Sequence, residues 1–235
     1  MKIMKNNQGF TVTELMIATA VFSILLLLSL AGFLQIGQLF YKGVNITQTS
    51  DAANQVAKSL KGDVSFDPSN EVISKTSQTF TVTGPTGPLT LTRNWFCVGS
   101  NRYSYILGRQ LDIDAQANEM QTQPDEPNGW YNYALLVDKL SSIGCPDPFN
   151  GSSRLTKDDA KEMLGDKMRL SNLSITQLPS PNDKLYTISI KIAYGDDEVL
   201  QDPSSTSPSC LSNPAYSKYC FVTDIKTVAR KGLEP

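Results

Sequence analysis

Residues 9–41 read GFTVTELMIATAVFSILLLLSLAGFLQIGQLFY, and this stretch decides how the rest of the chain is organised. From Leu15 to Tyr41 there are 27 residues without a charged side chain. A helix that crosses a membrane needs about 20 predominantly apolar residues. The sequence therefore predicts a transmembrane segment at about residues 15–36, followed by a much more polar region.

The composition excludes several classes of function. The 235-residue chain has no histidine, so it has neither a Ser-His-Asp nor a Cys-His catalytic pair and lacks the imidazole ligands of most catalytic zinc sites. Its 21 basic and 23 acidic residues give a net charge of −2, which does not indicate a nucleic-acid-binding protein. We expect no enzyme and no cofactor, with a carboxylate-based enzyme as a less favoured alternative.

The N-terminus allows three interpretations. Lys2 and Lys5 before an apolar run are typical of a secretory signal peptide, and Ser29-Leu30-Ala31 has the small-x-small pattern of a cleavage site. The same features fit a plain membrane anchor whose lysines stay inside. Neither accounts for Glu14, because a carboxylate in a membrane helix costs roughly 2.5–3.5 kcal/mol on insertion scales.

The third interpretation explains Glu14. Residues 9–17, GFTVTELMI, resemble the cleavage and methylation motif of type IV prepilins and of the pseudopilins of type II secretion systems. The resemblance implies a leader at residues 1–9, cleavage between Gly9 and Phe10 by the prepilin peptidase, and N-methylation of Phe10. It also implies that Glu14 pairs with the amino group of a neighbouring subunit, which removes much of the cost of burying either charge alone.

The resemblance also implies partners and a location. The partners are other pilin subunits through their N-terminal helices, the prepilin peptidase, an inner-membrane assembly platform, and membrane lipid before assembly. The protein would be a single-pass membrane protein with an extracytoplasmic head, and part of an extracellular pilus or pseudopilus after assembly. Such filaments serve adhesion, twitching motility, secretion or competence.

A long helix is predicted over residues 10–62. Ile46, Ala53 and Leu60 recur every seven residues and form a narrow apolar stripe after the membrane segment. Gly62-Asp63 is expected to stop the helix. The first half of this helix is apolar all round and the second half is amphipathic, as in pilin subunits.

Residues 63–235 are expected to form one β-rich head, so the fold class is α+β, with the helix packed on an antiparallel sheet. Apolar residues alternate in Tyr186–Tyr194, which predicts a strand facing the helix, and residues 221–228 predict a last strand. Residues 80–91 predict a hairpin. Residues 130–137 predict a strand or short helix, and Thr156 begins a predicted short helix to about Met168. The length of the head favours a minor subunit, nearest to the large J component of secretion pseudopili.

Four cysteines follow the membrane segment: Cys97, Cys145, Cys210 and Cys220. An even number outside the cytoplasm favours two disulfides, for which three pairings exist. Cys210–Cys220 is preferred because it closes a short proline-containing loop, and pilins often carry a C-terminal disulfide loop. That leaves Cys97–Cys145, with free thiols or a metal site as alternatives.

Two further groups of residues suggest ligands. Asp196, Asp197, Glu198 and Asp202 form a weak calcium candidate, for which a solvated acidic turn is the simpler interpretation. A basic group near Tyr216 and Tyr219 would allow weak DNA contact; it consists of Lys218, Lys226, Arg230 and Lys231. Trp95, Trp130 and Tyr131 would suit a host glycan, although core packing explains them equally well. The alternative function is therefore a membrane-anchored or secreted adhesin or DNA-capture domain.

Overall fold

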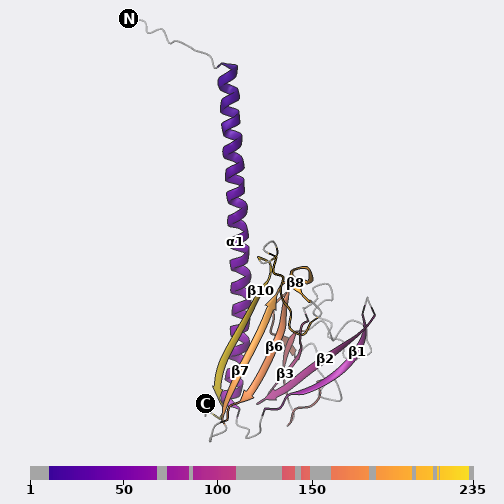
Figure 1. The fold of residues 1–235 in the computed structure, drawn as a ribbon. Coiled ribbons are helices and arrows are strands. Elements are labelled where there is room, and N and C mark those ends of the chain that lie inside the picture. The colour runs from indigo at the N-terminus through magenta and orange to yellow at the C-terminus, as the bar shows by residue number, and fades with distance from the viewer. Residues whose placement is uncertain are drawn as a thin grey trace. The chain divides into compact units, whose positions relative to one another are not determined.

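The computed structural model describes residues 11–67, 73–84, 87–109, 134–140, 144–148, 160–179, 184–202, 205–213, 216 and 218–232. It combines one long N-terminal helix with antiparallel sheets, which confirms the α+β fold class (Figure 1). The chain divides into two compact units, residues 1–43 and residues 44–235. They are described separately below.

The helix α1 spans Val12–Phe66. In the first unit its side chains are apolar and exposed, including the run Ile24 to Leu28. This part is long and apolar enough to cross a membrane, although length and composition alone do not distinguish a membrane span from a signal sequence. In the second unit the buried side chains follow the predicted stripe, with Ala53, Val56 and Leu60 fully buried.

The prediction that Gly62-Asp63 ends the helix was wrong, because α1 continues four residues beyond Gly62. Glycine inside a helix costs up to about 1 kcal/mol relative to alanine. Burying Val64, which has 0% exposure, contributes about 1.5–3 kcal/mol and outweighs this cost. Asp63 is also bound by the head, since Asn101 Nδ2 donates to its Oδ2 at 2.8 Å and the Tyr103 hydroxyl donates to the same oxygen.

Five strands form the larger sheet, in the order β1-β2-β3-β4-β5, and every neighbouring pair is antiparallel. The strands are β1 (Thr76–Gly84), β2 (Gly87–Val98), β3 (Asn101–Ile106), β4 (Leu135–Lys139) and β5 (Ala160–Glu162). The predicted hairpin is β1 and β2, in which Gly84 pairs with Gly87. The prediction of a turn at this point is confirmed.

A second sheet has three antiparallel strands in the order β10-β7-β6, and Figure 1 shows them along the second half of α1. They are β6 (Met168–Gln177), β7 (Leu185–Tyr194) and β10 (Phe221–Arg230). A short helix η3 (Asp197–Val199) leads to a small ladder of β8 (Leu200–Gln201) and β9 (Ser209–Cys210). The last predicted strand is confirmed and is two residues longer than expected.

The core joins the second half of α1 to both sheets. In β7 the buried residues alternate as predicted, and Ile188, Ile190 and Ile192 have 0% exposure. They belong to one hydrophobic cluster with α1 residues such as Leu60 and with the ring of Phe96 from β2. The amphipathic part of α1 is therefore held by burial in the head.

The prediction of a helix from Thr156 to Met168 was wrong where the structure can be described. Residues 156–159 lie outside the described residues, whereas Ala160–Glu162 form β5 and Met168 begins β6. Glu162, inside the predicted helix, is instead a β5 residue whose side chain has a tertiary role, described below. Of the predicted segment 130–137, residues 135–137 are strand in β4 and residues 130–133 lie outside the described residues.

Candidate functional site

The N-terminal site consists of Thr11 and Glu14, at the start of α1. The Thr11 backbone N–H donates to Glu14 Oε2 at 2.9 Å, and the Thr11 hydroxyl donates to the same oxygen at 2.8 Å. The Glu14 N–H donates to Thr11 Oγ1 at 3.3 Å. This reciprocal pattern is a capping box, which satisfies backbone donors at the helix start. Gly9 and Phe10, the predicted cleavage and methylation site, lie outside the described residues.

The capping box changes how Glu14 must be interpreted. From its position in the sequence, Glu14 is expected to be a cost that only a partner amine offsets. The structure gives the carboxylate a local function within one subunit, because it caps the helix. Any intersubunit role of Glu14 is therefore additional to this function and must be tested separately from it.

The head contains two disulfides. Cys97 pairs with Cys145 and Cys210 with Cys220, with Cα–Cα distances of 5.5 and 5.6 Å. These are the pairs that the loop argument favoured. The first attaches the segment at residues 144–148 to β2, and the second closes the short loop that precedes β10.

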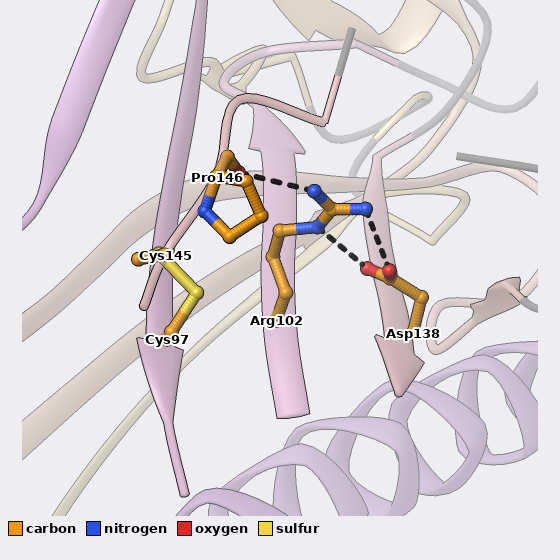
Figure 2. Close-up of a disulfide and its surroundings, with 5 residues drawn as sticks. All are labelled: Cys97, Arg102, Asp138, Cys145 and Pro146. Atoms are coloured by element: carbon orange, nitrogen blue, oxygen red, sulfur yellow. Dashed lines mark hydrogen bonds and ion pairs between the residues drawn. A yellow bond between two sulfur atoms is a disulfide. The ribbon is translucent and has the colours of Figure 1, made fainter. Parts of the chain in front are cut away.

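A buried ion pair lies beside the first disulfide (Figure 2). Arg102 Nη2 and Nε donate to Asp138 Oδ2 and Oδ1 at 2.7 and 3.1 Å, and the two side chains are 1% and 5% exposed. Arg102 Nη1 also donates to the Pro146 carbonyl at 3.0 Å. In the sheet register, Cys97 is opposite Arg102, which is opposite Asp138. The disulfide and the arginine thus hold neighbouring residues of one segment against the sheet.

Sequence reasoning did not single out Arg102, Asp138 or Glu162. The available signal was a charged residue beside apolar strand residues. Arg102 precedes Tyr103 and Tyr105 in one strand, and Asp138 follows Leu135 to Val137 in another. Such a charge is rarely buried unless it is paired. Only the strand register shows which carboxylate faces the arginine.

Glu162 is held by backbone donors. Its Oε1 accepts N–H groups from Leu135 at 2.9 Å and Leu164 at 3.1 Å, and its Oε2 accepts the Ala134 N–H at 3.1 Å. Burial raises the pKa of Glu162 to about 7, while these hydrogen bonds act in the opposite direction. The side chain ties β5 to the start of β4.

The raised pKa of Glu162 makes a pH-dependent prediction. Because the folded head favours the protonated form, this residue contributes stability that is fully present below its ordinary pKa of 4.5 and is lost as the pH rises through about 7. We expect the unfolding free energy of wild type to fall relative to that of Glu162→Gln between pH 4.5 and pH 8. The reason is that glutamate at this position must lose its proton over this range, whereas glutamine does not titrate. Denaturant unfolding of both proteins at several pH values measures this, and a constant difference would contradict it.

Two of the acidic residues proposed for calcium form ion pairs instead. Lys167 Nζ lies 2.8 Å from Asp196 Oδ2, and Arg169 pairs with Asp197. Within the described part of the chain, no three His, Cys, Asp or Glu side chains are placed to hold a metal ion. The loop is instead attached to the turn before β6 and to β6 by ion pairs.

The basic group near the C-terminus is divided by the fold. Lys231 is 6% exposed, and its Nζ lies 3.0 Å from Asp67 Oδ2 just beyond α1. Lys226 and Arg230 are exposed on β10. Lys218 lies over the ring of Tyr219, 5.0 Å from its centroid. Lys231 is therefore not available for the DNA contact that the sequence suggested.

Of the three aromatic residues of the predicted glycan surface, the structure describes Trp95. Trp95 is buried in the head with 5% exposure, which favours core packing. Trp130 and Tyr131 lie outside the described residues.

The C-terminal disulfide stabilises a second, smaller cluster. Cys220 packs there with Ala193, Val199 and Leu200, and the Leu211 N–H donates to the Val199 carbonyl at 3.0 Å. In the chain-entropy model, a bridge with a sequence separation of 10 contributes about 3 kcal/mol. We expect Cys210→Ala/Cys220→Ala to lower stability by about this amount.

This loss should be greatest around β8 and β9. Amide exchange should accelerate there, and trypsin should cleave earlier at Lys218. Exchange that rises equally in β2 and β3 would contradict a local role for this disulfide.

Comparison with known families identifies the N-terminus. Residues 4–30 match the prokaryotic N-terminal methylation motif. This is the signature of type IV prepilins and pseudopilins, so the resemblance is confirmed for this segment. No curated protein and no solved structure matches the chain. With the apolar helix, the motif supports a single-pass membrane anchor with an extracellular head.

Proposed function

We propose that this protein is a minor type IV pilin or pseudopilin, a structural subunit of a membrane-anchored filament and not an enzyme. The observation that carries the proposal is the methylation motif at residues 4–30, placed at the start of an apolar helix that can cross a membrane. The motif supports a processed, pilin-type subunit. The minor role rests on the length of the chain.

Processing follows from the position of the motif. The prepilin peptidase would cut between Gly9 and Phe10, and the new amino group of Phe10 would be methylated. This leaves a cationic amine four residues before Glu14. Within the membrane, each charge alone is costly, so pairing between neighbouring subunits favours one axial register of the helices.

The partners follow from the same geometry. The exposed apolar side chains of residues 15–36 contact lipid before assembly and other pilin helices afterwards. The chain would reach them through an inner-membrane assembly platform. Because Lys231 and Trp95 are buried, a DNA or glycan ligand of the head has less support than filament assembly.

Intact mass of the membrane-extracted protein tests the proposal. We expect a chain that begins at N-methylated Phe10, and we expect Gly9→Val to retain residues 1–9. A wild-type chain that begins at Gly32 would show a signal peptide, and one that begins at Met1 would show an unprocessed anchor. Either of these results would refute the proposed function.

A further inference from the structure

A hollow in the head lies where the two sheets approach each other. Its volume is about 190 Å³. Part of its wall comes from β2 and β3, part from β6, and part from the segment that precedes β1. The Tyr105 hydroxyl donates to the Leu173 carbonyl at 3.4 Å, so β3 and β6 are joined at this point. The lining residues used below are Ile73, Lys75, Phe96, Tyr105, Asn172 and Ser174.

Lys75 gives the hollow a positive charge. Its Nζ lies 5.4 Å from the centroid of the Tyr105 ring, and burial lowers the pKa of this ammonium group. None of the described residues that line the hollow is an aspartate or a glutamate. Across the described residues, no carboxylate forms an ion pair with Lys75. Lys75 is exposed as a residue, so its ammonium group is accessible, and a cation with no described carboxylate beside it favours an anionic ligand.

The rest of the lining combines hydrogen-bonding groups with apolar walls. Asn172 and Ser174 are two residues apart on β6, so they lie on the same face of that strand. The ladder between β6 and β7 shifts register between Leu170 and Asn172, which is a bulge of the kind often found beside binding sites. Ile73 and the ring of Phe96 are apolar. Such a mixture binds a ligand that has both a charged group and a compact body.

The volume limits the size of that body. At about 190 Å³, the hollow exceeds the roughly 150 Å³ of a protein cavity that binds benzene. This is enough for a single six-membered ring with one substituent.

We propose that this hollow binds a compact organic carboxylate with a ring body. Its carboxylate would face Lys75, Asn172 and Ser174, and its ring would lie against Phe96 and Tyr105. This site is independent of filament assembly, since it uses only residues of the head. It would give the subunit a small-molecule or terminal-sugar ligand in addition to its structural function.

Ligand-observed saturation-transfer NMR on the full chain in detergent micelles tests the proposal. The probes are benzoate and D-glucuronate, with benzamide and D-glucose as neutral counterparts and empty micelles as the blank. We expect saturation transfer to at least one carboxylate and none above the blank to its neutral counterpart. A response from benzoate alone would favour an apolar ring, and one from glucuronate alone would favour an acidic sugar.

Variants distinguish a specific role of Lys75 in binding from a general effect of removing a positive charge. Lys75→Met should weaken binding at least about tenfold, because a hydrogen bond to a charged group is lost. Lys75→Arg should keep most of the affinity, and Lys226→Met, at an exposed site on β10, should leave it unchanged. The absence of carboxylate binding to wild type would overturn the proposal. Equal binding to a folded Lys75→Met protein would also overturn it.

Discussion

Asp138→Ala is expected to destabilise the head by about 3–5 kcal/mol, because it leaves the charge of Arg102 buried without the carboxylate that faces it. The guanidinium is 1% exposed, so water cannot replace the lost carboxylate. Domains of ordinary stability unfold with about 5–15 kcal/mol, so the loss is a large part of the total. Denaturant unfolding of the detergent-solubilised protein, with both disulfides intact, measures it.

Two controls test whether the loss arises because the ion pair is buried, and not merely because an ion pair is removed. Lys167→Ala removes an ion pair of similar length that is largely exposed, with side chains 36% and 51% exposed, and should cost less than about 1 kcal/mol. Arg102→Met/Asp138→Leu removes both buried charges and should be less harmful than Asp138→Ala alone. If Asp138→Ala and Lys167→Ala cost the same, the buried pair does not have the role assigned to it.

Glu14→Gln is expected to reduce incorporation into filaments at least about tenfold while leaving the subunit folded in the membrane. Glutamine can replace glutamate in a capping box, so the start of α1 remains capped. It cannot neutralise the amine of a neighbouring subunit, so the proposed intersubunit pair is lost. The measurement is the ratio of this subunit in sheared filaments to that in membranes, in a strain that lacks the wild-type gene.

Thr11→Ala is the matched control for Glu14→Gln. It removes the threonine hydroxyl from the cap, which typically costs about 0.5–2 kcal/mol, but it keeps the carboxylate charge. We expect it to assemble nearly as well as wild type. If Thr11→Ala fails and Glu14→Gln assembles normally, Glu14 acts as a helix cap and the proposed charge pair is refuted.

The N-terminal part of the protein was predictable because its determinants are local. An uncharged run from Leu15 to Tyr41 fixes a helix that can cross a membrane, whatever follows it. The motif around Glu14 is contiguous, so no folding is needed to recognise it. The strand at β7 was also visible, since its buried residues alternate with a period of two from Tyr186 to Ile192.

Several features of the head could not be predicted, because they depend on contacts between residues far apart in the chain. Glu162 lies in a segment that resembled a helix, but it accepts backbone N–H groups from Leu135 and Leu164 and belongs to a strand. The end of α1 was misplaced because Val64 is buried and Asp63 binds the head. The acidic residues Asp196 and Asp197 suggested a metal site, whereas their partners are Lys167 and Arg169.

The sequence by itself determined the membrane helix, its processing motif and the strong alternation of β7, because hydrophobicity and short motifs are properties of neighbouring residues. Contacts between distant residues determine which carboxylate neutralises Arg102 and where α1 ends, and they confirm the cysteine pairing that loop length favoured. These outcomes require strand register across separations such as the 36 residues between Arg102 and Asp138. Buried charges must find partners wherever the fold brings them, and sequence spacing does not record that position.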